Sequence, residues 1–270
     1  MYSIIKSGMA SAMHELSVIS NNVANANSNG FKKSLVSFAD FAGGLFPTSV
    51  QSSANGLGSQ IDETRISNAQ GAILSTENKT DMALVGNGFF ALQDVKDNSI
   101  SFTRNGSFGV DDQGFLTNAD NHRVLGTPIF EDDFGQIPDN IDALLPIQIP
   151  STKDDLVMSE LLIEGDGRIF ARYGEQDPVP ISSLTLGIFS NPIGLKELGK
   201  ARFSATENSG LLTLGAPMSS GFADLQIGGL EVSNVNITDE LTAMIKAQQQ
   251  FNGSARLMQA NSDMVEKLTR

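Results

Sequence analysis

The residues of this sequence that are best suited to chemistry are two histidines and one run of three acidic residues. His14 falls in a stretch with helical spacing and His122 in a predicted turn, and the chain has no cysteine. Two histidines placed so far apart do not make a zinc site, which takes four ligands. Glu131, Asp132 and Asp133 are consecutive, whereas a calcium loop alternates its ligands along the chain. The acidic run is therefore interpreted as a solvated turn, and we predict no metal site.

The sequence motifs of nucleophilic and phosphate-binding enzymes are also missing. No serine lies in a G-x-S-x-G arrangement, the sharp turn that exposes a nucleophile. Gly165-Asp166-Gly167 lies between predicted strands, and the lysine of a phosphate-binding loop does not follow it. Asp111 and Asp112 are expected to form a turn. We therefore predict no catalytic residue and no cofactor, and the protein is expected not to be an enzyme.

The net charge of −13 is spread unevenly over the 270 residues. Acidic and basic residues balance within residues 1–27 and again within residues 236–270, so the whole negative charge lies between these ends. All nine prolines also lie in the middle, from Pro47 to Pro217. This charge disfavours nucleic acid and anionic membranes as partners. The basic doublet Lys32-Lys33 is therefore interpreted as a solvated or inter-subunit contact.

The N-terminus shows no cleavable signal peptide, because polar residues such as Lys6, His14 and Glu15 interrupt its apolar residues. No apolar run is long enough to span a membrane, so no membrane insertion is expected. The absence of cysteine excludes disulfides and leaves the redox compartment open. The chain is expected to be cytoplasmic or to be exported by a route that reads no cleaved leader.

Both ends of the chain repeat apolar or small residues at steps of three and four, the heptad pattern of helices that pack lengthwise. We predict one helix over residues 1–26 and another over residues 238–270. Thr238 is expected to cap the second helix, with Asp239 and Glu240 in its first turn, where negative charge is favoured. The predicted seams are Ile5, Met9, Ala12, Leu16, Ile19 and Val23 in the first helix, and Leu241, Met244, Gln248, Phe251, Ala255, Met258, Ser262 and Val265 in the second.

Two interpretations of these seams remain open. The helices are core elements of one globular domain, or they pair with each other or with copies in other subunits. The second interpretation predicts that Ile5, Met9, Leu16, Ile19 and Val23 face Leu241, Met244, Phe251, Met258 and Val265.

An asparagine-rich segment, residues 21–33, follows the first helix. Asparagine competes for backbone groups inside a helix and tolerates left-handed dihedral angles. Five asparagines followed by Gly30 therefore predict a helix stop with a shaped turn. The segment is either a polar loop or a turn whose amides bond neighbouring backbone.

The middle of the chain is predicted to be an antiparallel β domain, because short apolar runs alternate with glycine turns. The tight turns are expected at Asn105-Gly106, read as a hairpin dipeptide, at residues 111–114 and at residues 165–167. Residues 49–59 are expected to be an extended or partly disordered linker. The predicted fold class is α+β, with a helical domain of residues 1–30 and 236–270, a connecting segment of residues 31–80 and 217–235, and a central β domain of residues 81–216.

Several segments together resemble one family, the rod and hook proteins of the bacterial flagellar axis. Asn21-Asn22-Val23-Ala24-Asn25 followed by Gly30-Phe31-Lys32 is similar to its N-terminal signature, and residues 229–236 with Glu240 and Met244 are similar to its C-terminal one. Residues 86–90, 103–106 and 189–195 resemble segments of rod proteins. This chain has Gln250-Phe251 where the family usually has an Arg-Tyr pair, so the arginine is missing.

The resemblance implies a structural subunit of the basal-body rod, with terminal helices that form an inner tube and a β domain that faces outward. It implies export by the flagellar type III apparatus, without a cleaved signal peptide, and helical assembly with copies of itself and other rod and hook proteins in a periplasm-spanning rod. The length favours a rod over a hook subunit; the distal-rod type is favoured and the proximal type is the alternative. A hook-type subunit and, from another class, a secreted β-domain enzyme or adhesin are the remaining alternatives. The expected assembly interface comprises Ile5, Met9, Leu16, Ile19, Asn21, Asn22, Val23, Asn25, Gly30, Phe31, Lys32, Asn234, Asn236, Leu241, Met244, Gln248, Phe251, Met258 and Val265.

Overall fold

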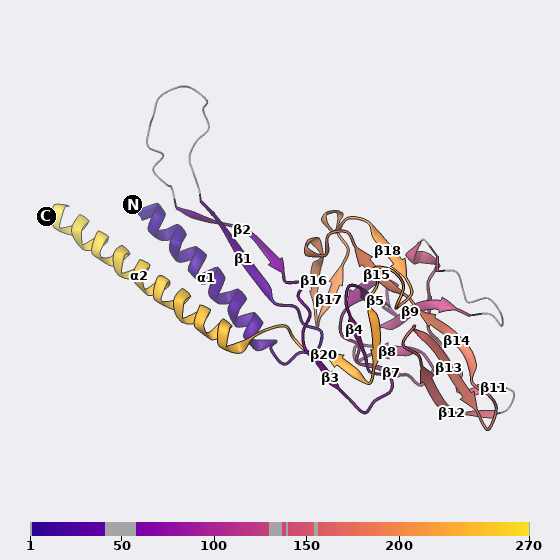
Figure 1. The fold of residues 1–270 in the computed structure, drawn as a ribbon. Helices are drawn as coiled ribbons and strands as arrows, with labels where there is room; N and C mark the ends of the chain where they lie inside the picture. The colour runs from indigo at the N-terminus through magenta and orange to yellow at the C-terminus, as the bar shows by residue number, and fades with distance from the viewer. Residues whose placement is uncertain (1, 41–57, 130–136, 139, 154–155, 270) are drawn as a thin grey trace. The chain divides into compact units, whose positions relative to one another are not determined.

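The computed structural model describes residues 2–40, 58–129, 137–138, 140–153 and 156–269. The chain divides into two compact units (Figure 1). The helical unit consists of Met1–Ala26, Lys33–Ser67 and Val235–Arg270, and the β unit consists of Asn27–Lys32 and Asn68–Asn234. The expected α+β class is confirmed, because two long helices accompany a mainly antiparallel sheet. The three-part domain division stays a prediction.

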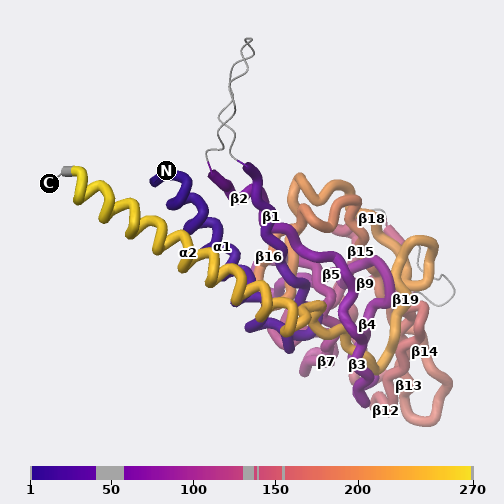
Figure 2. The backbone as a smooth tube through the Cα atoms, turned by 60° about the vertical axis from the view of Figure 1, so that its left-hand side comes forward, coloured from indigo at the N-terminus to yellow at the C-terminus, as the bar shows by residue number. Residues whose placement is uncertain are grey.

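The helical unit contains α1 (Tyr2–Ala24), α2 (Ile237–Thr269) and an antiparallel hairpin of β1 (Ser34–Asp40) and β2 (Ser59–Ile66). The two helices run antiparallel along each other, and the hairpin lies beside α1 (Figure 2). Two side-chain contacts join α1 to β2: Ser11 Oγ lies 3.0 Å from Ser59 Oγ, and His14 Nε2 lies 3.2 Å from Thr64 Oγ1. Most of the segment expected to be extended, residues 49–59, lies outside the described residues.

The start of α2 differs from the sequence prediction. The helix begins at Ile237, and Asn236 Oδ1 accepts a hydrogen bond from Thr238 N at 3.0 Å. Asn236 therefore caps the helix two residues before the predicted cap, and Thr238 lies inside the first turn, where its backbone N–H is the one that a cap satisfies.

The β unit is built around one sheet of 14 strands with the order β11-β12-β13-β14-β9-β5-β6-β17-β16. Outside this path, β10 pairs with β9, β15 with β5 and β18, and β8 with β7 and β9; β3 pairs with β20 and β4 with β19 in two further ladders. The strands are β3 (Ile73–Ser75), β4 (Met82–Val85), β5 (Phe89–Gln93), β6 (Ile100–Thr103), β7 (Phe108–Val110), β8 (Leu116–Asn118), β9 (Arg123–Pro128), β10 (Leu145–Pro146), β11 (Thr152–Lys153), β12 (Leu156–Ile163), β13 (Arg168–Tyr173), β14 (Val179–Leu184), β15 (Leu186–Phe189), β16 (Lys196–Gly199), β17 (Arg202–Ser204), β18 (Leu212–Gly215), β19 (Asp224–Ile227) and β20 (Gly229–Glu231).

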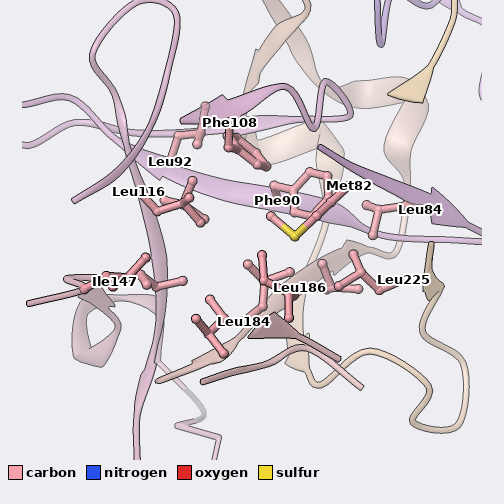
Figure 3. Packing of buried hydrophobic residues seen from close by; sticks show 14 of the residues in the cluster. Met82, Leu84, Phe90, Leu92, Phe108, Leu116, Ile147, Leu184, Leu186 and Leu225 are labelled. Atoms are coloured by element: carbon pink, nitrogen blue, oxygen red, sulfur yellow. The ribbon is translucent and has the colours of Figure 1, made fainter. Parts of the chain in front are cut away.

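A hydrophobic core fills the β unit (Figure 3). Phe90 and Phe108 meet edge to face with ring centroids 5.1 Å apart, a geometry that aromatic pairs favour. Short strands with β-branched, leucine and phenylalanine side chains supply the rest of this core. Its buried members are Met82, Leu84, Phe90, Leu92, Phe108, Leu116, Val124, Ile147, Ile149, Ile163, Ile169, Ala171, Tyr173, Leu184, Leu186, Ala223 and Leu225.

Two of the three predicted tight turns are confirmed and one is wrong. Residues 111–114 connect β7 to β8, and residues 165–167 connect β12 to β13. Asn105-Gly106 makes no hairpin, because β6 pairs with β5 and β17 while β7 pairs with β8. Gly106 is required by close packing instead, since a Cβ there would lie 1.6 Å from the carbonyl oxygen of Met82. The dipeptide therefore marks a backbone crossing, and local sequence does not distinguish the two.

Candidate functional site

Asn22, within the first family-like segment, is the centre of a buried polar cluster in the helical unit. Its amide bonds both backbone groups of Ser34: Nδ2 donates to the carbonyl oxygen and Oδ1 accepts from the backbone nitrogen, each at 2.9 Å. Nδ2 also donates to Glu240 Oε2 of α2 at 3.1 Å. A single side chain thereby joins α1, β1 and α2.

The same cluster includes one ion pair, between Lys33 Nζ and Glu240 Oε1 at 3.7 Å. Glu240 is buried, and the Lys33 side chain is a quarter exposed. A partly exposed pair of this length contributes little to stability, because solvent screens it. The hydrogen bonds of the Asn22 amide, rather than this ion pair, are therefore the main contacts that hold the cluster together.

The asparagine-rich segment follows the end of α1 as predicted, although none of the asparagines of residues 21–29 has a positive φ. Asn25 donates from its backbone nitrogen and from Nδ2 to the carbonyl oxygen of Asn21, at 3.1 and 3.0 Å, which ends α1. Gly30, in the β unit, has a φ of +69°, and a Cβ there would lie 2.4 Å from the backbone nitrogen of Asn105. Only glycine meets both demands without strain.

Glu231 is the centre of a second buried cluster, which lies within the β unit. Its Oε1 accepts hydrogen bonds from Lys32 Nζ at 2.6 Å and from Gly71 N at 2.8 Å, and its Oε2 lies 3.4 Å from Arg104 Nη1. The side chains of Lys32 and Arg104 are 2% exposed and that of Glu231 is fully buried. Gly30 N donates to the Glu231 carbonyl oxygen at 2.7 Å. This cluster therefore ties the N-terminal family-like segment to the C-terminal one.

Both cations of this cluster have further partners. Lys32 Nζ donates to the Ala69 carbonyl oxygen at 2.8 Å, an acceptor that it shares with Nδ2 of Asn234. Arg104 Nη2 donates to the Gly86 carbonyl oxygen at 2.7 Å. Burial lowers the pKa of Lys32 and of Arg104, and the carboxylate of Glu231 opposes this effect on both.

The predicted seams of α1 and α2 are partly buried in the chain alone. Ile19 is buried, and the other predicted seam residues of α1 are half-buried or, for Ala12, buried. On α2 the buried positions are Glu240 and Ala247, which the predicted seam does not contain. Leu241 and Val265 are 46% and 54% exposed. The remaining predicted seam residues divide into half-buried Met244, Phe251, Ala255 and Met258 and exposed Gln248 and Ser262.

The two helices also carry large apolar side chains that water reaches. Among the described residues of the two helices, ten such side chains are at least 41% exposed. A helix with an apolar row outside its packed seam has a second surface to bury. The exposed apolar side chains are Tyr2, Ile4 and Met13 on α1, and Ile237, Leu241, Ile245, Leu257, Met264, Val265 and Leu268 on α2. Leu268, at 84%, is the most exposed.

The residues expected to do chemistry lie apart from one another. His14 contacts Thr64 in the helical unit, whereas His122 Nε2 lies 3.2 Å from Asp94 Oδ2 and contacts Arg202 in the β unit. The run of Glu131 to Asp133 lies outside the described residues. Within the part of the chain that the structure describes, no three metal-binding side chains gather at one place, and neither helix has an apolar stretch of the length that crossing a membrane requires.

Sequence reasoning named Asn22 and Lys32 as site residues but missed the other members of the two clusters, including Glu231, the centre of the second. Ser34 and Glu240 complete the Asn22 cluster, and Arg104 and Glu231 complete the Lys32 cluster. The four residues belong to, or adjoin, segments that resemble the rod proteins. Their spacing in the chain gives no signal, because a contact over 127 or 218 residues leaves no local pattern.

Comparisons with known proteins identify the family. Three family models match: "Flagella basal body rod protein" over residues 6–32, "Flagellar hook protein FlgE/F/G D1 domain" over 83–171 and "Flagellar basal body rod FlgEFG protein C-terminal" over 226–270. The flagellar basal-body rod protein FlgG of Bacillus subtilis is 32% identical over 272 residues, which cover 97% of this chain and 95% of that protein.

Two further relatives separate the rod from the hook. The flagellar basal-body rod protein FlgG of Buchnera aphidicola subsp. Baizongia pistaciae is 30% identical over a region that covers 98% of this chain and 97% of that protein. The flagellar hook protein FlgE of Borreliella burgdorferi is 35% identical, but the matched region covers only 44% of this chain and 29% of the hook protein. The hook alternative is therefore less supported. The chain belongs to the family of flagellar basal-body rod proteins, as a structural subunit of the distal-rod type.

Proposed function

We propose that the helical unit is the part of this rod subunit through which copies assemble with one another and with other rod and hook proteins of the flagellum. The observation that carries the proposal is the exposed apolar row on α1 and α2, with Leu241 and Ile245 among its members. Burying such side chains contributes about 1.5–3 kcal/mol each, which a neighbouring helix supplies. Most of the residues predicted as the assembly interface belong to this unit, whereas Gly30, Phe31, Lys32 and Asn234 belong to the β unit.

Charge supports the same assignment. The chain ends, residues 1–27 and 236–270, are each neutral, so helices from several copies can pack closely without repulsion. The excess of acidic residues elsewhere keeps free subunits soluble. A head-to-tail contact between copies that does not close produces a helical filament, and a rod that transmits motion in the bacterial flagellum requires such a continuous axis.

The route to the rod follows from the same role. We propose that the flagellar type III apparatus exports the chain without a cleaved signal peptide, and that the subunit functions in the periplasm-spanning part of the basal body. Among its described residues the helical unit buries few apolar side chains, so this part of the chain unfolds at low cost. Export through a narrow channel would also require the core of the β unit to be unfolded. In this role the protein is a structural component and performs no catalysis.

The change Leu241→Asp tests the proposal, with Val95→Asp as the matched control. Both side chains are about half exposed, 46% and 50%, so neither change disturbs a core. Leu241 lies on α2 and Val95 in the β unit. We expect Leu241→Asp to abolish assembly into rods, seen by electron microscopy, and motility in cells that lack their own rod subunit. Normal rods from Leu241→Asp, or equal loss from both variants, would contradict the proposal.

A further inference from the structure

A cavity of about 280 Å³ opens beside the buried cluster of the β unit. Its lining includes Asn68, Asn87, Phe89, Arg104, Ile188 and Ser190, which come from three separate stretches of the chain and from the cluster itself. One water takes about 30 Å³ in the liquid, so the cavity has room for several waters or for one side chain.

Arg104 is the unusual member of this lining. Its side chain is 2% exposed, and within the described residues its Nε–H has no hydrogen-bond partner. Its other nitrogens are used: Nη1 lies 3.4 Å from Glu231 Oε2 and Nη2 donates to Gly86 O at 2.7 Å. A buried N–H without a partner is costly, so this donor indicates an acceptor that the chain alone does not supply.

The charge of the cluster specifies the acceptor. Lys32 and Arg104 are two cations, and both share the single carboxylate of Glu231. The three side chains therefore leave one positive charge in a buried place, which an anion would balance. A carboxylate on the Nε of Arg104 would also make a charge-assisted hydrogen bond, the stronger kind.

The other walls favour a carboxylate on an apolar stem over a free inorganic anion. The Phe89 ring is buried and lies 5.3 Å from the Arg104 guanidinium carbon, and Ile188 is half-buried beside it. These side chains can cover methylene groups, while the exposed amides of Asn68 and Asn87 can donate to an oxygen at the entrance. Aspartate and glutamate side chains have this combination.

We propose that the Arg104 cavity receives an acidic side chain from a neighbouring copy of this chain in the assembled rod. The inference rests on the proposed assembly of copies. Charge complementarity favours this occupant, because residues 28–235 carry the whole net charge of −13 and a neighbouring copy therefore presents many carboxylates. Acidic surfaces repel one another unless a cationic site accepts one of the charges, so the cavity would fix the register between copies.

The site itself is tested by nuclear magnetic resonance on the full-length monomer, with acetate as the probe and acetamide as the neutral molecule of the same shape. We expect the Nε–Hε resonance of Arg104 to shift and saturate with acetate and not with acetamide. Asn87→Asp places a carboxylate at the entrance of the cavity. It should lower the affinity for acetate about tenfold, since one nearby like charge opposes binding by about 1.4 kcal/mol. Asn98→Asp adds the same charge in the turn between β5 and β6, outside the lining of the cavity. This variant should bind acetate with the affinity of the wild type.

The partner is tested by assembly of the same two variants in cells that lack their own rod subunit. We expect Asn87→Asp to reduce the yield of rods about tenfold and Asn98→Asp to leave it unchanged. An Arg104 resonance that ignores acetate, or that responds equally to acetamide, would overturn the site. Normal rods from Asn87→Asp would overturn the neighbouring copy as its occupant. A wild-type chain that binds acetate at Arg104 but forms no rods would overturn the proposed assembly and this partner, and would leave the carboxylate site standing.

Discussion

Each of the two units of this subunit contains a buried polar cluster, and the two clusters differ in the charge that they bury. In the helical unit a neutral amide, that of Asn22, makes the central bonds, and the ion pair beside it is partly exposed. In the β unit Lys32, Arg104 and Glu231 are almost completely removed from water. Breaking an amide contact loses hydrogen bonds, whereas stranding a buried ion costs more.

The apolar cores of the two units differ in the same direction. Among the described residues of the helical unit, the buried apolar side chains are Ala12, Ile19 and Ala247. The β unit has a continuous core that includes Phe90, Leu116 and Ile169. A region with few buried apolar contacts opens at lower free energy. The comparison indicates that the helical unit opens at lower free energy than the β unit.

The largest expected effect comes from removing the carboxylate of the β unit's cluster. Glu231→Ala would leave two buried cations and the Gly71 N–H without their shared acceptor. We expect the free energy of unfolding of the monomer to fall by about 3–5 kcal/mol, measured by urea denaturation. The control is Glu63→Ala in the exposed pair with Arg65, which should change the free energy of unfolding far less, because solvent screens that pair. Equal losses from both variants would mean that burial of the cluster does not matter.

A smaller effect is expected at the centre of the helical unit's cluster. Asn22→Ala removes the bonds to both backbone groups of Ser34 and the bond to Glu240. We expect a loss of about 2–3 kcal/mol, confined to the helical unit, since buried backbone groups lose their partners. Hydrogen exchange would show it as faster exchange in α1 and β1 with unchanged protection in the β unit. Asn252→Ala, at an exposed position of α2, should change stability by less than about 0.5 kcal/mol.

The sequence was sufficient for the elements whose signals are local. The heptad steps predict both helices, and the α+β class is confirmed. Glycine turns at residues 111–114 and 165–167 are placed correctly because the turn chemistry lies within four residues. Asn105-Gly106 misled the prediction, since the Gly106 requirement comes from the backbone of Met82, a contact that sequence spacing does not encode.

The candidate site divides in the same way. Asn22 and Lys32 belong to segments that resemble the rod proteins, as Glu231 and Glu240 do, but the resemblance does not show which residues contact one another. Their partners Glu240 and Glu231 are about 200 residues away in the chain, so tertiary packing alone brings them together. The cap at Asn236 shows the limit on a small scale, because Asn and Thr are both good capping residues and sequence leaves the choice between them open.

The smallest expected effect is a pH dependence that belongs to the β unit. Burial lowers the pKa of Lys32 in the folded chain below its unfolded value near 10.5. Below the folded pKa both states bind the proton, and the folded state bears the full cost of a buried ammonium. Between the folded pKa and 10.5 the unfolded state binds more protons, so rising pH relieves that cost and stabilises the fold.

Lys32→Met removes this titration and leaves Arg104 and Glu231 as a balanced pair. The free energy of unfolding of Lys32→Met minus that of the wild type is therefore expected to decrease as pH rises toward 10.5, measured by urea denaturation at several pH values. A difference that increases over this range would reverse the sign and would mean that Glu231 outweighs burial at Lys32. The buried charge of the β unit would then be fully compensated, and its contrast with the amide cluster of the helical unit would be one of geometry alone.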